Sequence, residues 1–321
     1  MKRVIKNPHV RQLNMRLLLD SYIEMKEARN LSKDTIRNIK LSVNKWLNYL
    51  EASEYDLDPS KLDSKYIYSF SKHYLGEELR PTSLNHYLRD IRTFVYWMAD
   101  EGYCQRFKID LVKEQEAIVD TYTDEEMELL LAKPHLNATY GEWRTWAVIN
   151  WMYATGNRAS TVCNIKLEDL NFTKQEIRIT KTKTNKAYII PMSTALRNVI
   201  QEFVEQWRAE VFTSPNSYLF ANIGDEKLTT NALHLAVVRY NQSRGVEKTS
   251  VHAFRHTFAK AWVRNNGDVF RLQKMLGHTT LDMTKRYVNM FSEDLKEGFN
   301  NFNPLDRMKK GTSRTKKIQK N

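Results

Sequence analysis

The sequence contains little cysteine, glycine or proline. Its 321 residues include two cysteines, 10 glycines and 7 prolines. Cys104 and Cys163 form neither a CxxC pair nor a spacing typical of metal ligands, so we expect no disulfide framework and a reducing environment. The shortage of glycine and proline argues against a loop-rich or disordered chain.

Long apolar segments and nucleotide-binding motifs are also missing. No run of residues is apolar over the length of a membrane span, and the basic start, Met1–Pro8, precedes no hydrophobic segment of a signal peptide. We therefore expect no membrane partner and a cytoplasmic location. The sequence has no GxxxxGK[ST] loop and no acidic cluster typical of two-metal nucleases, so we expect no cofactor and no metal.

Positive charge, by contrast, is in excess. Fifty Lys and Arg residues against 38 Asp and Glu residues give a net charge of +12. Such an excess is typical of proteins that bind nucleic acid. The hydrophobic fraction of 41% is enough for real cores, and the length allows about two domains.

Helical periodicity dominates the N-terminal part of the chain. Apolar residues recur at helical spacing through residues 12–51 and again from Leu84 to Met98, with a break at Arg80–Ser83. A charged, weakly periodic stretch follows, which we interpret as a linker. The predicted organisation is an N-terminal tail (1–11), a helical domain (12–107), a linker (108–120), a second domain (121–300) and a basic C-terminal tail (301–321).

The second domain contains the only convincing strand pattern, within Glu176–Met192. Ile177 and Ile179 alternate with polar residues, and the pattern resumes at Tyr188–Ile190. The remaining patterns of this domain are helical, near residues 194–210, 229–242, 252–265, 268–276 and 279–289. The sequence thus predicts a mainly α protein with one small antiparallel β-sheet.

Cationic and imidazole side chains precede a tyrosine in this second domain. His252 and Arg255 are spaced to share one face of a helix. The planar fork of arginine matches two phosphate oxygens at once, and a tyrosine hydroxyl such as that of Tyr287 is a possible nucleophile. The pattern indicates a site where cationic donors hold a phosphodiester while a tyrosine attacks it. The candidate site residues, in chain order, are Arg158, Lys183, His252, Arg255, His278 and Tyr287.

These motifs resemble those of the tyrosine recombinases, also called phage integrases, over roughly residues 12 to 300. One position departs from the family, because Thr161 stands where an acidic residue is usual. The matching segments are Thr155-Gly156-Asn157-Arg158 for the first arginine box, Lys183 for the hairpin lysine, His252-x-x-Arg255 for the second box, Leu276-Gly277-His278 for the third, and Tyr287 for the nucleophile.

The resemblance implies a two-domain recombinase and assigns a role to each matched residue. Residues 12–107 would be the core-binding domain, which binds DNA, and residues 121–300 the catalytic domain. The two arginines would hold the phosphate, with His278 as a third donor, and Lys183 would protonate the leaving 5′ oxygen. A tyrosine with a pKa of about 10 needs a base, and His252 is the candidate base or proton relay. The product would be a 3′-phosphotyrosyl bond at Tyr287.

Three other interpretations start from the same residues. A type IB topoisomerase shares the phosphotyrosine chemistry, and a DNA-binding regulator could keep a decayed version of the site. His252 and His256 also have the i, i+4 spacing of some zinc ligands, but no HExxH motif and no acidic third ligand is evident. We therefore do not expect a zinc site, and we expect His256 to be a packing or supporting residue.

The expected partners are double-stranded DNA recombination sites and further copies of the chain. Leu295, Phe299 and Phe302 recur at helical spacing after the nucleophile, and such a stripe must be buried somewhere. Tyrosine recombinases commonly dock a C-terminal helix into the neighbouring protomer. We therefore expect a homo-tetramer on two DNA duplexes, associated with the prokaryotic nucleoid when bound, with an accessory directionality factor as a further candidate partner.

Overall fold

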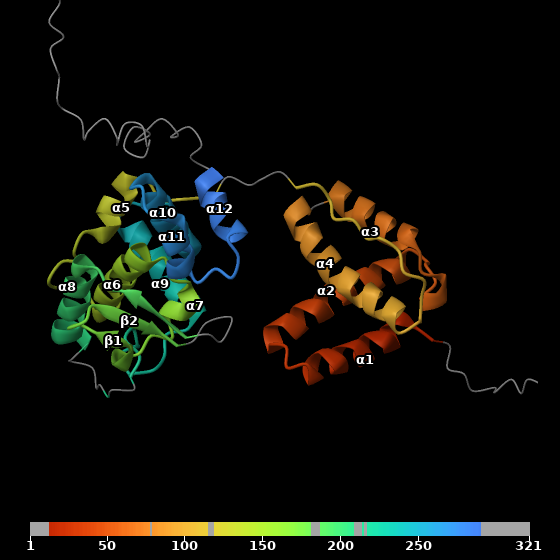
Figure 1. Ribbon diagram of the computed structural model, residues 1–321, viewed down its shortest axis with the longest axis horizontal. Helices are drawn as coiled ribbons and strands as arrows, with labels where there is room; N and C mark the ends of the chain where they lie inside the picture. The colour runs from red at the N-terminus through yellow and green to blue at the C-terminus, as the bar shows by residue number, and fades with distance from the viewer. Residues whose placement is uncertain are drawn as a thin grey trace, which may run out of the picture. The chain divides into compact units, whose positions relative to one another are not determined.

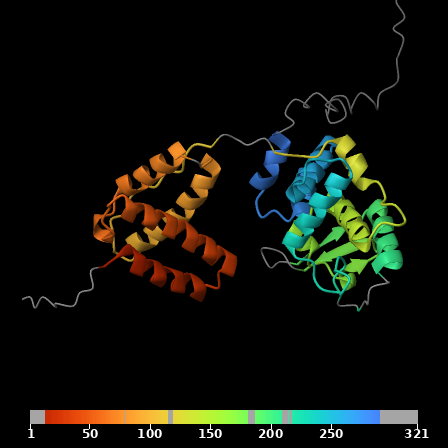
Figure 2. The same cartoon turned by 180° about the vertical axis from the view of Figure 1, so that it is seen from behind.

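The computed structural model describes residues 13–77, 79–114, 119–180, 187–208, 214 and 217–289. Contacts divide the chain into two compact units, Met1–Ala117 and Ile118–Asn321, each drawn from opposite sides in Figures 1 and 2. The described part is mainly helical with one small antiparallel sheet, which confirms the predicted fold class. Among the described helices, none combines the length and apolarity needed to cross a membrane.

The first unit is built from helices that begin where the sequence predicts. The Ser32 hydroxyl caps a helix by accepting a hydrogen bond from the Thr35 N–H at 3.2 Å. Pro81 opens another helix, since a first-turn residue needs no N–H partner. Trp46 and Phe94 are fully buried in its core. The described elements are α1 (Met15–Ala28), α2 (Lys33–Ala52), η1 (Pro59–Lys61), α3 (Ser64–Glu77) and α4 (Pro81–Asp100).

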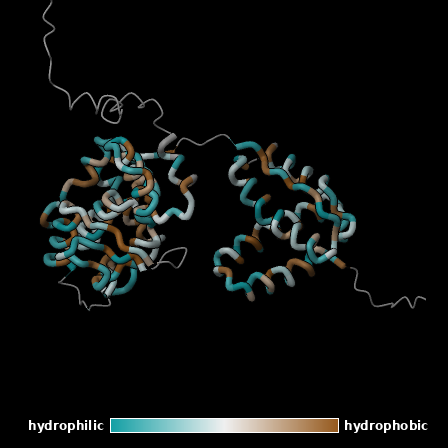
Figure 3. Tube along the Cα trace, viewed as in Figure 1, coloured by the Kyte–Doolittle hydropathy of each residue, from teal (hydrophilic) through white to brown (hydrophobic). Residues whose placement is uncertain are grey.

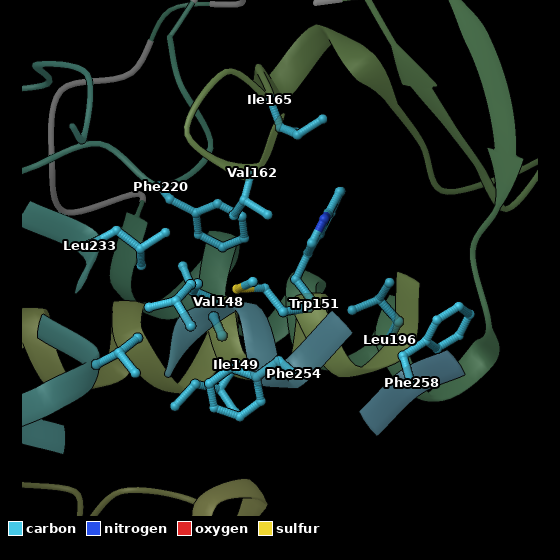
Figure 4. Packing of buried hydrophobic residues seen from close by; sticks show 14 of the residues in the cluster. Val148, Ile149, Trp151, Val162, Ile165, Leu196, Phe220, Leu233, Phe254 and Phe258 are labelled. Atoms are coloured by element: carbon cyan, nitrogen blue, oxygen red, sulfur yellow. The ribbon is translucent and has the colours of Figure 1, made fainter. Parts of the chain in front are cut away.

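The second unit surrounds one largely buried helix, α6, which packs against α8, α9 and α10. Figure 4 shows side chains of α6, including Val148 and Trp151, in the same cluster as Phe254 of α10. The described elements are α5 (Asp124–Leu131), α6 (Tyr140–Thr155), α7 (Ala159–Val162), η2 (Leu167–Asp169), β1 (Leu170–Asn171), β2 (Glu176–Ile179), β3 (Tyr188–Pro191), α8 (Thr194–Glu202), η3 (Phe203–Arg208), α9 (Thr230–Ser243), α10 (Val251–Arg264), α11 (Val269–Leu276) and α12 (Asp282–Asn289).

The sheet has the strand order β1-β2-β3, and both pairs of neighbours are antiparallel. Ile177 pairs with Ile190 and Ile179 pairs with Tyr188 across β2 and β3. The alternating residues Ile177 and Ile179 are fully buried, so the predicted hairpin is confirmed. Its tip, residues 181–186, lies outside the described residues, and the expected position of Lys183 falls within it.

Both ends of the expected linker, 108–120, contact the units that they join. Ile109 is 3% exposed within the first core, and the Val112 N–H donates to the Asn85 side chain at 2.8 Å. Val119 belongs to the core of the second unit. Hydrophobic and hydrophilic residues alternate along the helices of each unit, as Figure 3 shows, which matches the amphipathic patterns read from the sequence.

Candidate active site

Arg255 joins the segments that carry the other site residues. It lies in α10 with only 2% of its surface exposed. Its Nη1 donates to the Gly156 carbonyl oxygen at 2.7 Å, and its Nη2 donates to the Leu276 carbonyl oxygen at 2.9 Å. One guanidinium therefore holds together the first and third boxes predicted from the sequence, although they are far apart in the chain.

The first box is a sharp turn at the end of α6. Gly156 ends the helix at φ +63°, and a Cβ at this position would overlap the Phe258 ring. Asn157 fixes the next residue by accepting from the Trp151 Nε1–H at 3.1 Å. Arg158 is the N-cap residue of α7, and its half-buried side chain takes no part in capping the helix. Only glycine fits the turn that aims this arginine, which explains the Gly-x-Arg order.

The third box places His278 against the guanidinium. Gly277 ends α11 at φ +62°, and the following His278 Nε2 lies 2.7 Å from Arg255 Nη2. Because arginine can only donate, this Nε2 must be unprotonated. The proton therefore sits on Nδ1, which lies 2.9 Å from the Thr284 hydroxyl. Burial, together with the nearby Arg255 and Arg158, lowers the pKa of His278 to about 4.

Tyr287 lies in α12, beside α10 and α11 in Figure 1, and is 4% exposed. Its hydroxyl is 2.7 Å from Nδ1 of His256. Burial and the nearby Arg158 lower the pKa of the Arg255 guanidinium, and an interaction with Tyr287 partly opposes this by raising it. The net pKa of Arg255 is about 10, so the group stays cationic at neutral pH. The predicted nucleophile thus lies between an imidazole and a cation.

His252 stands at the first turn of α10 with part of its side chain exposed. Its ring meets that of His256 edge to face, with centroids 4.6 Å apart. Partial burial, then the positive charges of Arg255 and Arg158, lower the pKa of His252. His252 therefore belongs to the cluster, while the hydrogen bond to the tyrosine comes from His256.

A further tyrosine, Tyr188, lies at the start of β3, directly after the hairpin tip. Burial raises its pKa, and the charges of Arg255 and Arg158 oppose that rise, so the hydroxyl lies in the field of both arginines. A Cβ on Gly277 would stand 2.9 Å from the Tyr188 hydroxyl oxygen. β3 thus packs, through Tyr188, directly on the turn that precedes His278.

Five of the predicted site residues lie in the described structure, and their contacts and charges place all five in one cluster: Arg158, His252, Arg255, His278 and Tyr287. Sequence reasoning missed the contacts of His256 and Thr284. Thr284 is fully buried and lies three residues before Tyr287, on the same face of α12. Within the described ranges, no group of three or more His, Cys, Asp or Glu side chains could hold a metal ion. Thr161 is buried in α7, and its N–H donates to the Arg158 carbonyl oxygen at 2.8 Å.

The family model of the phage integrase family matches residues 121–293, more than half of the chain. The chain belongs to the phage integrase family. It is a tyrosine recombinase, an enzyme that breaks and rejoins DNA in site-specific recombination. The topoisomerase and decayed-regulator interpretations are not favoured.

Relatives of this tyrosine recombinase match almost its whole length. The tyrosine recombinase XerD of Listeria innocua is 24% identical over 294 residues, which cover 89% of this chain and 98% of that protein. A XerH site-specific recombinase bound to a palindromic difH substrate, in a post-cleavage complex, has a TM-score of 0.68 at 20% identity and covers 88% of this chain and 83% of that one. A lambda integrase in a tetramer bound to a Holliday junction has a TM-score of 0.65 at 16% identity, with coverage of 87% and 83%. The likeness to the two solved structures shows the shared fold.

Proposed function

We propose that Tyr287 attacks a DNA phosphodiester and forms a 3′-phosphotyrosyl bond, which a 5′-hydroxyl later reverses to join the strands. The observation that carries this proposal is the position of the Tyr287 hydroxyl, 2.7 Å from the His256 imidazole and beside the buried Arg255 guanidinium. A nucleophile between a possible proton acceptor and a fixed cation is a typical activated arrangement. Because the covalent bond conserves the energy of the broken linkage, rejoining needs no ATP.

Arg158 and Arg255 hold the phosphate in this proposal. A pentavalent transition state carries more negative charge than the diester, and donors already in place stabilise it without reorganisation. Three of the five N–H donors of a guanidinium are engaged by Gly156, Leu276 and His278. In this proposal the other two donate to the tyrosine hydroxyl and to a phosphate oxygen.

His278 and Lys183 complete the proposed donor set. The Thr284 hydroxyl can donate or accept, so His278 can change tautomer without losing that bond. Its Nε2–H then becomes a third donor once a phosphate engages Arg255. Lys183 is the acid that protonates the leaving 5′ oxygen, and His252, at the exposed edge of the cluster, exchanges protons with solvent.

The proposed substrate is a pair of double-stranded DNA recombination sites, bound by a homo-tetramer in the cytoplasm. Support comes from the net charge of +12 and from the fold shared with a lambda integrase tetramer bound to a Holliday junction. We propose that residues 12–107 bind DNA as a core-binding domain and residues 121–300 catalyse the reaction. An accessory directionality factor is the proposed regulator of integration against excision.

Tyr287→Phe tests this function. The substrate is a duplex enriched from a random-sequence pool by its binding to the full-length protein, nicked at successive positions so that cleavage releases a short strand. We expect wild-type protein to form a protease-sensitive DNA adduct in EDTA. Tyr287→Phe should form none yet bind the duplex within about 0.5 kcal/mol, because affinity comes from many phosphate contacts.

Tyr218→Phe is the matched control, since Tyr218 lies in the same unit away from the contacts of the cluster. It should form the adduct at the wild-type rate. An adduct that persists in Tyr287→Phe would overturn the assignment of the nucleophile. Strong relaxation of supercoiled DNA by the monomer, without sequence preference, would favour the topoisomerase alternative.

A further inference from the structure

We infer that His256 is the catalytic base, which takes the Tyr287 proton during cleavage and returns it during rejoining. This inference rests on the proposed function and assigns the proton transfer from the attacking tyrosine, which is distinct from the transfer to the 5′ oxygen assigned to Lys183. The sequence motif is satisfied by His252 and Arg255 alone, so nothing in the box itself gives His256 a chemical role. The contact between His256 Nδ1 and the Tyr287 hydroxyl, 2.7 Å long, supplies it.

The donors around the hydroxyl fix the direction of that hydrogen bond. The Arg255 guanidinium has only N–H donors, and its interaction with Tyr287 therefore uses a lone pair of the hydroxyl oxygen. In the proposed step the tyrosine hydroxyl therefore donates its hydrogen to His256 Nδ1, which accepts it. This is the geometry in which a proton moves from oxygen to nitrogen as the oxygen attacks, while the guanidinium stabilises the charge left on oxygen.

The other imidazoles of the cluster are less suited to this step. His278 uses Nε2 to accept from Arg255 and Nδ1 to donate to Thr284, so both ring nitrogens are engaged. The ring of His252 meets the ring of His256 edge to face, and His256 in turn lies against the Tyr287 hydroxyl. His252 lies exposed on the first turn of α10, where it can exchange protons with solvent.

Each bond that forms in the proposed step is matched by one that breaks. The Tyr287 Oη–H bond breaks and its proton passes to His256 Nδ1, while an Oη–P bond forms and the P–O5′ bond breaks. The 5′ oxygen takes its proton from the acid assigned to Lys183. In rejoining, the 5′-hydroxyl returns a proton to that acid and attacks phosphorus, and the tyrosine oxygen leaves with the proton from His256. The bound phosphate supplies negative charge, which offsets both arginines when the imidazolium forms.

His256→Ala and His256→Asn, in the full-length protein, separate proton transfer from positioning. Asparagine places an acceptor oxygen near the position of Nδ1 but cannot take up a proton. We expect both variants to bind the selected duplex like wild type and to cleave the nicked duplex about 100-fold more slowly in single turnover. Added imidazole should partly restore His256→Ala, and His234→Ala, at an exposed histidine of α9, should cleave like wild type.

A duplex with a 5′-bridging sulfur gives a second readout, because a thiolate leaves without a proton. The defect of the His256 variants should persist on this duplex, since their missing step is on the attacking side. Near-normal cleavage by His256→Asn would mean that His256 only positions the tyrosine. Cleavage as fast as wild type by His256→Ala would mean that the contact exists only in the DNA-free protein and has no role in the reaction. Either result overturns the inference. If wild type itself forms no adduct, the proposed function fails, and that outcome is distinct from both.

Discussion

Each residue of the site is held by a neighbour whose chemistry restricts it. Arg255 is buried among carbonyl oxygens rather than carboxylates, so its charge remains uncompensated within the contacts described. Burial and, after it, the nearby Arg158 lower its pKa to about 10. An incoming phosphodiester relieves the repulsion between the two arginines. Burial, together with the charges of both arginines, also keeps the neighbouring His278 neutral.

The role of Lys183 is testable through its leaving group. Lys183→Ala should slow cleavage of an ordinary duplex by about 100-fold or more, because the 5′ oxygen would leave without its proton. A duplex with a 5′-bridging sulfur should restore the rate, measured in single turnover. Lys181→Ala is the control from the same hairpin and should cleave both duplexes alike. Absence of rescue in Lys183→Ala, or an equal defect in Lys181→Ala, would move the acid elsewhere.

His278 should make stability depend on pH in a defined direction. Its folded pKa of about 4 lies below the ordinary 6.5, so the unfolded chain binds more protons between these values. Stability is therefore fully present above about 6.5 and falls as the pH drops toward 4. After allowance for partial exposure of the ring, we expect a loss of about 1 kcal/mol between pH 7 and pH 5.

His278→Gln isolates this contribution, because its amide oxygen can still accept from Arg255 but does not titrate. Urea unfolding of both proteins at pH 7 and pH 5 gives the change in the free energy of unfolding of each. The difference between the two changes isolates His278, because the other titrating groups are the same in both proteins. Wild type should lose more stability than the variant on acidification. Equal losses would show that His278 has an ordinary pKa in the folded protein.

The sequence predicted which residues lie in one cluster better than which of them touch. Order and spacing singled out Arg158, Arg255 and Tyr287 as candidates, because boxes with fixed neighbours leave few alternatives, and the structure brings these three together. Nothing in the spacing could decide between His252 and His256, which lie one turn apart on the same helix. That choice depends on where α12 docks on α10, and this docking is a tertiary contact that local periodicity does not encode.

At the scale of elements, two helix ends determine where the arginine finds its acceptors. α6 and α11 both end in a left-handed glycine, and the carbonyls of Gly156 and Leu276 at these ends receive the Arg255 hydrogen bonds. Tyr188 of β3 packs against the second of these turns, at Gly277. The turns therefore act as rigid supports rather than as flexible loops.

Gly277→Ala tests this packing. The added Cβ would occupy a left-handed position and stand 2.9 Å from the Tyr188 hydroxyl oxygen. We expect a loss of about 1–3 kcal/mol in the free energy of unfolding and slower cleavage, because Leu276 and His278 would shift away from the guanidinium. Chemical denaturation and the single-turnover assay measure the two effects.

Two controls separate strain from contact. Gly245→Ala has a similar positive φ of +72° with open space around it, so it should cost backbone strain alone and cleave normally. Tyr188→Phe removes the closest contact and should recover part of the loss when combined with Gly277→Ala, which a double-mutant cycle measures. If the double variant loses as much as the sum of the single ones, Tyr188 does not press on the turn.

Periodicity predicted the elements well where one face is buried and poorly where the backbone departs from regular geometry. The predicted helix near 194–210 is α-helical only to Glu202 and continues as the π-helical turn η3. That turn carries Arg208, which is fully buried and paired with Asp225. β1 has two residues, too few for an alternating pattern. Leu17 is one of the apolar residues at helical spacing within 12–51, yet it is 49% exposed, whereas Leu19 and Ile23 of the same helix are buried.

At the scale of the whole molecule, the proposed assembly involves a segment beyond α12. The apolar residues Leu295, Phe299 and Phe302 lie outside the described residues, so the expected exchange of a C-terminal helix between protomers stays a prediction. A ring of identical head-to-tail contacts would couple neighbouring active sites. The proposed tetramer would then assemble on two duplexes from a monomer or weak oligomer.

Truncation after Met290 tests that assembly. Paired-duplex complexes should weaken by about tenfold or more, equivalent to about 1.4 kcal/mol, while binding to a single site changes little. A chain ending at Asn303 is the matched control, because it keeps Leu295, Phe299 and Phe302 but lacks the basic tail. Gel-shift titrations resolve single-site and paired complexes. Paired complexes that survive truncation after Met290 would show that this segment packs within its own protomer.

The central claim is that one side chain of this protein becomes covalently joined to DNA at a defined end. Mass spectrometry of the proteolysed adduct, formed on the nicked duplex in EDTA, measures both the residue and the end. We predict that the nucleotides are attached to the peptide containing Tyr287 through a 3′-phosphate, and that the released strand carries a free 5′-hydroxyl. Attachment at another residue, or through a 5′-phosphate, would contradict the account.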